Sequence, residues 1–133
     1  MGTTTRCDFF YTADHEWINF KGSIAYVGIC SFKLTGFREI HSITFQKSSG
    51  FLKAEEVIAT ISYNDYRIEA HMPVDGKILQ LNKTLLSEGK NILVKQPENS
   101  GWIAVITPAQ PYERKGLLLP KTYQLNLKRR HAK

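Results

Sequence analysis

The sequence predicts a mainly all-β sandwich, and three observations support this fold class. Short runs in which apolar and polar residues alternate recur along the chain, with turn-forming residues between them. The composition, 42% hydrophobic and 11% aromatic, is typical of an ordinary folded protein. The 133 residues are enough for one domain that buries its own core. We therefore expect short strands with one or two short helical turns.

The first third of the chain predicts two strands and one helical turn. Trp17 and Ile18 are core candidates on the first strand, and Lys21-Gly22 is expected to form a turn. The second strand is Ser23–Ile29, because this run is rich in β-branched and aromatic residues. Ser31 is a suitable N-cap for a single helical turn after it, and Gly36 is expected to end that turn.

A further alternating run, Arg38–Phe45, predicts the next strand. Its inward-facing candidates are Ile40, Ile43 and Phe45. Ser48-Ser49-Gly50 is expected to break the chain after this strand, because these residues favour turns.

The centre of the chain, Ile61–Ile78, predicts a β-hairpin that ends in a second turn at Pro73–Gly76. Asn64-Asp65 is expected to form the hairpin loop, since these residue types tolerate positive φ and bond their own backbone. The loop should therefore stand out in solvent. Four side chains are expected to be exposed contacts at the tip: Asn64, Asp65, Tyr66 and Arg67.

The remaining apolar runs predict the end of the domain and one strand beyond it. Lys77–Leu81 alternates as a strand, and Leu85-Leu86 and Ile92-Leu93-Val94 supply apolar anchors. Ile103–Ile106 is expected to be the last strand of the domain. In the C-terminal segment, Tyr123–Leu127 is a candidate edge strand that could pair with another chain.

The formal charge of +6 comes from the C-terminal segment. Residues 110–133 hold seven Lys or Arg and one acidic residue, so the rest of the chain is neutral. A basic surface favours nucleic acid or anionic membranes. One functional alternative is therefore binding of such a partner through Lys128-Arg129-Arg130-His131, although short basic ends are usually solubilising tails.

The cysteines and the N-terminus predict a cytoplasmic protein. Cys7 and Cys30 are too few for a disulfide framework or a zinc cluster, and free thiols are expected in a reducing compartment. The first residues lack the apolar core of a secretory signal, and no run approaches the ~18 apolar residues of a membrane span.

The chain contains four groups of motif residues: His15-Glu16-Trp17, Gly28-Ile29, the set Pro73, Gly76 and Asn82 that follows the hairpin, and Gly101-Trp102. Together they resemble one known family, the glycine cleavage system H proteins of the lipoyl/biotinyl-domain superfamily. The resemblance covers about residues 10–108. It implies a barrel-sandwich hybrid of two small antiparallel sheets with a lipoyl-type hairpin. We accordingly expect a lead-in (1–8), an H-protein-like domain (9–108) and a basic extension (109–133).

The resemblance also implies where a lipoyl-lysine would stand. Aligned on the residues after the hairpin, that position is Asp65, and the family's preceding glutamate is Ser62. Lipoylation is acyl transfer to a primary amine, which a carboxylate does not offer. Arg67 is a poor acyl acceptor because its guanidinium stays protonated. No lipoate cofactor is therefore expected on this tip.

Without the attachment lysine, the expected function is a non-lipoylated protein-binding or scaffold module. The resemblance implies protein partners, with the glycine-cleavage enzymes among them, and no small-molecule substrate. The alternative is a working lipoyl and aminomethyl carrier that uses another lysine. Lys53 and Lys77 are the nearest lysines along the chain, and both are expected near the far ends of the hairpin arms.

Enzymatic and metal-binding interpretations have weaker support. His15-Glu16 could be an acid/base or metal pair, but it has no second ligand cluster in the sequence. Neighbouring strands could also bring together His41, Glu69 and His71, although no motif defines them as a site. We therefore expect neither catalysis nor a metal site.

Overall fold

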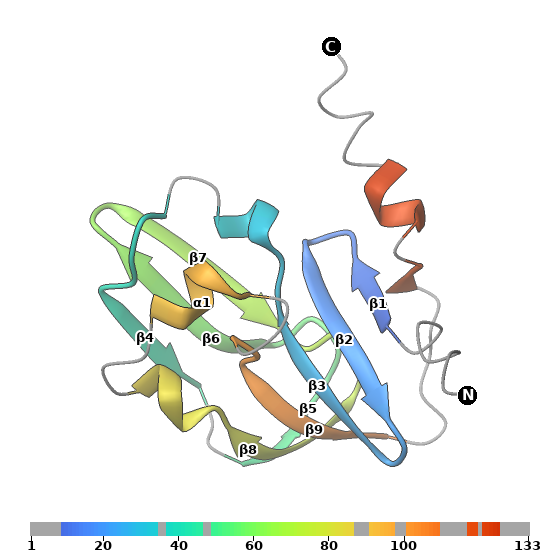
Figure 1. Cartoon of the computed structure of the whole chain (residues 1–133). Helices are drawn as coiled ribbons and strands as arrows, with labels where there is room; N and C mark the ends of the chain where they lie inside the picture. Colours follow the sequence, from blue (N-terminus) through green and yellow to red (C-terminus); the bar gives the residue numbers. More distant parts are fainter. Residues whose placement is uncertain are drawn as a thin grey trace.

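The computed structural model describes residues 9–34, 37–46, 49–86, 91–97, 101–109, 117–119 and 121–125. These residues form two antiparallel sheets and a few short helices, which confirms the predicted fold class (Figure 1). Within this part of the chain, no helix is long and apolar enough to cross a membrane.

The larger sheet has seven strands among the described residues, in the order β10-β1-β2-β3-β9-β8-β5. The strands are β1 (Phe9–Thr12), β2 (Glu16–Lys21), β3 (Ile24–Ile29), β5 (Gly50–Leu52), β8 (Gly76–Leu81), β9 (Ala104–Pro108) and β10 (Leu117–Leu118). The strands expected around Trp17, Ser23–Ile29, Lys77–Leu81 and Ile103–Ile106 are all present. β1, β5 and β10 were not predicted, because each is a run of only a few residues.

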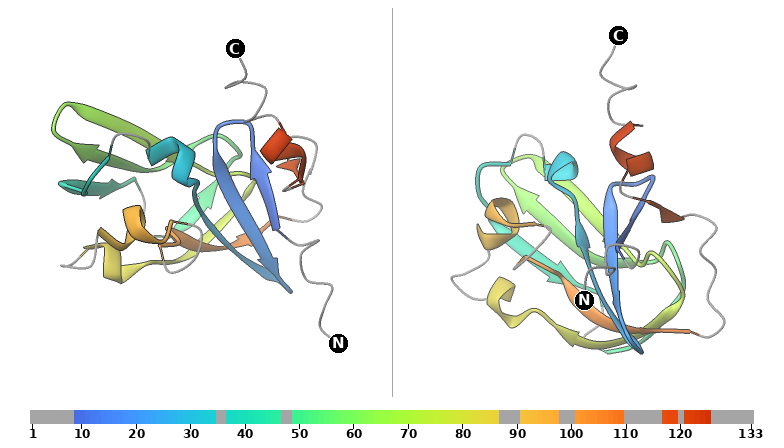
Figure 2. Two further views of the ribbon diagram at one scale, coloured as in Figure 1. Left: turned by 45° about the horizontal axis from the view of Figure 1, so that its top comes forward. Right: turned by 45° about the vertical axis from the view of Figure 1, so that its right-hand side comes forward.

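The smaller sheet contains β4 (Ser42–Phe45), β6 (Val57–Tyr63) and β7 (Tyr66–His71), in the order β4-β6-β7. β6 and β7 form the predicted hairpin, which projects from one end of the molecule (Figure 2). β7 is an edge strand of this sheet.

Four short helical segments connect or follow the strands in the described part of the chain. They are η2 (Ser31–Leu34), η3 (Lys83–Leu86), α1 (Ile92–Lys95) and residues 121–125. The helical turn predicted to begin at Ser31 is therefore confirmed. The proposed stop of that turn, Gly36, lies outside the described residues.

The main core lies between the two sheets. Side chains from both sheets share this core and are almost fully buried, among them Ile18, Ile29, Ile58, Ile61, Ile78 and Ile106. Burying each such side chain contributes about 2 kcal/mol relative to leaving it in water. The core therefore holds the small sheet, and with it the hairpin, against the larger sheet.

The strand predicted at Arg38–Phe45 is shorter in the structure, where β4 begins at Ser42. Ile40 is buried as predicted, but its backbone N–H donates to Asn91 Oδ1 at 2.8 Å instead of to a neighbouring strand. This side-chain acceptor from a distant segment keeps the first residues of the run out of the sheet. Gly50, predicted to break the chain, is instead the first residue of β5 and has φ +105°.

The edge strand predicted at Tyr123–Leu127 is wrong for its described residues. Residues 121–125 are helical, and Tyr123 N–H donates to Leu119 O at 2.9 Å. The Tyr123 ring stacks on Tyr11 at 4.4 Å between centroids. Its side chain is buried by this contact. The position beside β1 is taken by β10 instead, through the pair Tyr11 and Leu118.

Gly28→Ala is expected to destabilise the fold by about 2 kcal/mol. A Cβ at position 28 would lie 2.6 Å from the ring of Trp17, its cross-strand partner. The ring is held in place because Nε1 donates to Ile29 O at 3.1 Å and to Pro97 O at 3.0 Å. Urea unfolding measures the loss of stability. Thr44→Ala, a substitution at an exposed strand position, is the control. Equal stability of the two variants would contradict the close packing.

Candidate functional site

The tip of the β6–β7 hairpin is the first candidate site. Tyr63 and Tyr66 are paired across a two-residue loop, Asn64-Asp65, as the sequence predicted. Asn64 has φ +53°, a conformation that asparagine adopts more readily than most residues. Asn64, Asp65, Tyr66 and Arg67 are all exposed, and Tyr66 is 55% accessible. The tip thus presents polar, acidic, aromatic and basic groups to solvent.

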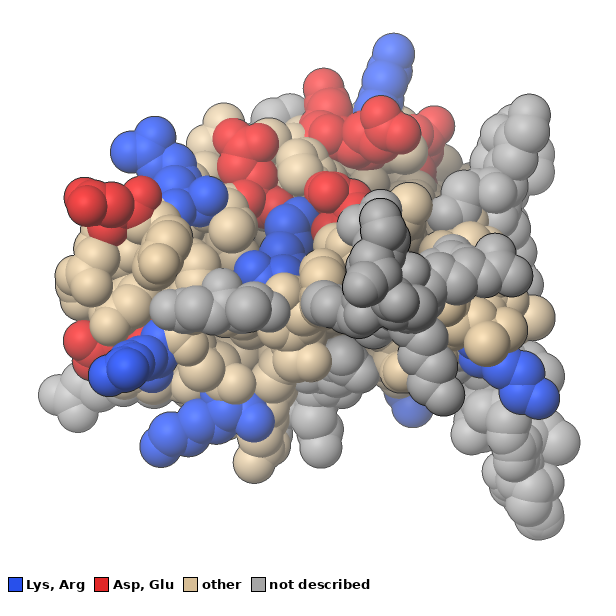
Figure 3. All heavy atoms as spheres, turned by 90° about the horizontal axis from the view of Figure 1, so that it is seen from above, with Lys and Arg blue, Asp and Glu red and all other residues tan. Residues whose placement is uncertain are grey.

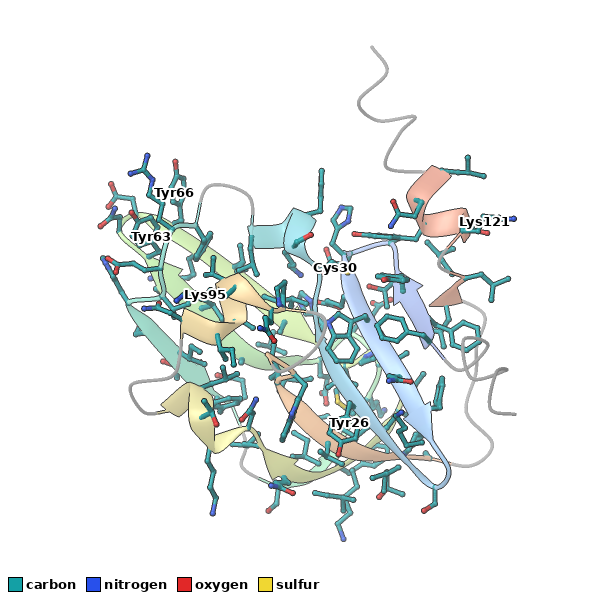
Figure 4. The ribbon with its side chains drawn as sticks, in the orientation of Figure 1. Tyr26, Cys30, Tyr63, Tyr66, Lys95 and Lys121 are labelled. Carbon is teal, nitrogen blue, oxygen red and sulfur yellow. The ribbon has the colours of Figure 1, made fainter. Side chains whose placement is uncertain are left out.

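Residues from the loop before β4 support the tip. The ring of Phe37 lies 5.9 Å from the rings of both Tyr63 and Tyr66, and the ring of His41 lies 4.9 Å from that of Tyr63. Asn64 N–H donates to His41 Nδ1 at 3.2 Å. Figure 4 shows Tyr63 and Tyr66 at the projecting end of the hairpin. Sequence reasoning missed Phe37 and His41, since only the fold places this loop beside the tip.

The two lysines considered as alternative acyl acceptors lie away from the tip. Lys53 precedes β6, and its backbone N–H donates to Glu56 Oε1 at 2.9 Å. Lys77 is on β8 in the larger sheet, where it pairs with Phe51 on one side and Thr107 on the other. Between Val57 and His71 the sequence contains no lysine.

A network of charged side chains forms the second candidate site, where η2, β2 and β7 meet. Lys33 Nζ lies 2.8 Å from Glu16 Oε2 and 2.9 Å from Asp14 Oδ2. His71 Nδ1 lies 2.7 Å from Glu16 Oε2 and 2.9 Å from Asp14 Oδ2. Glu69 reaches the other ring nitrogen of His71 at 3.5 Å. Figure 3 shows acidic and basic side chains interspersed over the face seen from above.

The two carboxyl groups of this network have opposite pKa shifts. Glu16 is only 2% exposed, and burial raises its pKa despite the opposing effects of Lys33 and His71. Burial also acts to raise the pKa of Asp14, but hydrogen bonding and charge attraction from Lys33, with the charge of His71, lower it overall. The ionised form of the buried Glu16 carboxyl group therefore depends on Lys33 and His71 for stabilisation more than that of Asp14 does.

The structure separates the residues of both catalytic interpretations. His15 Nδ1 lies 2.8 Å from Tyr123 Oη, whereas its neighbour Glu16 contacts Lys33 and His71. His41 contacts the hairpin tip and Glu39, at 3.4 Å. Glu69 and His71 do share a face, as predicted, but His41 is not part of their cluster.

Asp14, Glu16 and His71 have ligand atoms within 4.8 Å of one another, a spacing that a metal ion could use. The ammonium of Lys33 contacts both carboxylates of this group, so a positive charge already occupies their common side. We expect zinc titration followed by calorimetry to show no stoichiometric binding, in wild type and in His71→Ala alike. Tight binding that His71→Ala abolishes would contradict this expectation.

Two antiparallel sheets with an exposed hairpin at one end define a protein of the lipoyl-domain fold. The crystal structure of a glycine cleavage system H protein from Mycobacterium marinum has the same fold, with a TM-score of 0.77. The match covers 90% of this chain and 96% of that one, at 21% sequence identity.

The family model for the glycine cleavage H-protein matches residues 9–130, so the chain belongs to this family. A glycine cleavage system H protein from Bacteroides fragilis is 30% identical over 114 residues, which cover 86% of this chain and 90% of the relative. That of Pelodictyon phaeoclathratiforme is 32% identical over 119 residues, with 88% and 92% covered. Members of the family are lipoyl carriers and not enzymes themselves.

Proposed function

We propose that this protein is a non-lipoylated H protein that acts as a protein-binding or scaffold module. The observation that carries the proposal is the hairpin tip, whose residues include no lysine, and we assign Asp65 to the position of the family's lipoyl-lysine. A carboxylate cannot accept an acyl group to form an amide, and no lysine lies on either arm. The residues at this tip therefore do not fit lipoate.

The alignment that assigns Asp65 to this position is supported by the residues on which it rests. Gly76 begins β8, where an added Cβ would meet Thr107 O at 2.8 Å. The side chain of Asn82 donates to Trp102 O at 2.8 Å and accepts from Thr84 N–H at 3.1 Å. Both residues thus have a structural reason to stand where the family motif has them.

What the tip offers in place of a lipoyl arm is a contact surface. Asn64, Asp65, Tyr66 and Arg67 combine an exposed ring with both signs of charge, and the Phe37 and Tyr63 rings support them from beneath. Exposed aromatic and arginine side chains on a positioned loop are typical of protein interfaces. We propose other proteins as partners, with the glycine-cleavage enzymes as the first to test.

The experiment that tests this function is the intact mass of the protein purified from a lipoate-sufficient source. We expect the unmodified mass. A lipoyl adduct, located by peptide mapping on Lys53, Lys77 or another lysine, would overturn the proposal and support the carrier alternative. Pull-downs with the glycine-cleavage enzymes, comparing wild type with Tyr66→Ala, then test the contact surface.

Binding of nucleic acid or anionic membranes through the basic C-terminus is a separate alternative. The residues concerned, Lys128-Arg129-Arg130-His131, lie outside the described part of the chain. Its test is the removal of residues 128–133. If the tail binds phosphates, the truncated protein loses affinity for DNA or anionic vesicles, and the affinity of the intact protein falls steeply with salt. Unchanged binding after truncation would end this alternative.

A further inference from the structure

The outer edge of β7 carries backbone groups that no described strand uses. β7 is the last strand of the small sheet, after β4 and β6. His71 N–H points away from β6, because it donates to Glu16 Oε2 at 2.8 Å. Along an antiparallel strand, the backbone N–H and C=O groups of successive residues point alternately to one side of the strand and to the other. Arg67 and Glu69 therefore turn these groups to the same outer side as His71. An edge of this kind is a template for a further strand.

The side chains on this edge have a self-complementary pattern. Arg67 and Glu69 are exposed and opposite in charge, and they stand on either side of Ile68. A two-fold axis through Ile68 would place Arg67 of each copy opposite Glu69 of the other. The outward backbone groups of these two residues would then meet as two hydrogen-bonded pairs, giving about four hydrogen bonds.

We propose that β7 pairs antiparallel with β7 of a second copy of this chain, about an axis at Ile68. Only alternate residues have outward-facing backbone groups, so the two nearest other registers that keep the hydrogen bonds are each shifted by two residues. Both of these registers are electrostatically unfavourable. One places Arg67 opposite the partner's Arg67, and the other places Glu69 opposite the partner's Glu69. Like charges directly opposite each other destabilise a strand pair, whereas opposite charges stabilise it. The charges thus select one register.

The residues flanking this pair fit the same register. Tyr66, which is 55% exposed, stands opposite the partner's Ala70, so no second charged or bulky side chain opposes its ring in this register. Asp65 comes opposite the partner's His71. Pairing ends there, because Glu16 already accepts the outward N–H of His71. The interface is short, so the dimer should be weak and dependent on concentration.

This inference does not depend on whether the tip is lipoylated. It is tested by analytical ultracentrifugation of the full chain from micromolar to about millimolar concentration. We expect reversible dimerisation of the wild type. Arg67→Glu places two Glu pairs in the interface, and Glu69→Arg places two Arg pairs there. Each single variant should weaken the dimer about tenfold.

Mixing the two single variants provides the decisive control. A copy carrying Arg67→Glu presents Glu at both positions, and a copy carrying Glu69→Arg presents Arg at both. Their heterodimer therefore has two opposite-charge pairs and should regain the wild-type dissociation constant. The double variant R67E/E69R should regain it as a homodimer. Thermal unfolding of each variant verifies that both positions, which are exposed, tolerate the changes.

The other outcomes exclude the proposal. A wild type that stays monomeric throughout the concentration range would show that the edge does not pair with a second copy. A dimer that resists both single reversals, or a mixture that fails to regain affinity, would place the interface elsewhere. Binding of an extended peptide from another protein to a monomeric wild type would assign the edge to a different partner.

Discussion

Asp65→Lys is expected to change the hairpin tip from unmodified to almost completely lipoylated when the family's lipoate-attaching ligase is supplied. The two-residue loop already presents position 65 in solvent, and the substitution supplies the nucleophilic amine that the tip lacks. The substitution exchanges one exposed loop residue for another, so the stability of the fold should change by less than about 0.5 kcal/mol. Intact mass spectrometry after incubation with ligase and lipoate measures the modification.

Matched lysine variants make this experiment specific. Asn64→Lys and Arg67→Lys place an amine on the same tip, one residue before and two residues after position 65. If the alignment is correct, neither should be modified at a comparable rate. Modification of Asn64→Lys alone would shift the alignment by one residue. If folded Asp65→Lys stays unmodified, addition of Ser62→Glu, which restores the acidic residue before the lysine, shows whether the ligase surface has changed as well.

Lys33→Met should lower the free energy of unfolding by about 3 kcal/mol near neutral pH. Glu16 is buried with Lys33 Nζ at 2.8 Å, so the variant leaves a buried carboxylate that has lost its ammonium partner and keeps its contact with the His71 ring. The cost of that uncompensated charge is the main part of the expected effect. Urea unfolding measures it, with the exposed Lys21→Met as the control for loss of a positive charge.

The effect of Lys33→Met should become smaller as the pH falls. Burial already raises the pKa of Glu16, and loss of the ammonium raises it further, so acid neutralises the group in the folded variant before the unfolded one. Protonation of Glu16 therefore stabilises the folded variant relative to its unfolded state. The double variant K33M/E16Q should recover much of the loss at neutral pH. A cost of less than about 0.5 kcal/mol for Lys33→Met would show that the network does not support the fold.

The hairpin could be predicted from the sequence because its signals are local. Alternation through Ile61, Tyr63 and Ile68, with Asn64-Asp65 between the arms, specifies both strands and their register within a few residues. The exposure of the tip follows from the same pattern. The support given by Phe37 and His41 could not be predicted in this way, since it depends on how a separate loop packs.

The charged network could not be predicted from the sequence either, because its members come from elements far apart in the chain. Glu16 shares a face of β2 with the apolar residues Ile18 and Phe20, which hints at an inward-facing carboxylate, but its partners Lys33 and His71 are set by the packing of η2 and β7. Tyr123 was misassigned for a similar reason. Its alternating neighbours suggested a strand, and only the stack on Tyr11 shows why the residue is buried in a helical turn.

The pair between β1 and β10 affects the order in which the molecule can assemble during synthesis. β1 is synthesised before the other strands, whereas Leu118, its partner beside Tyr11, lies on the last of the described strands to be made. Until that segment emerges, the outer edge of β1 and the face of Tyr11 stay uncovered on a nearly finished domain. Nascent chains stalled before residue 117 should therefore be the most prone to pair wrongly through this edge.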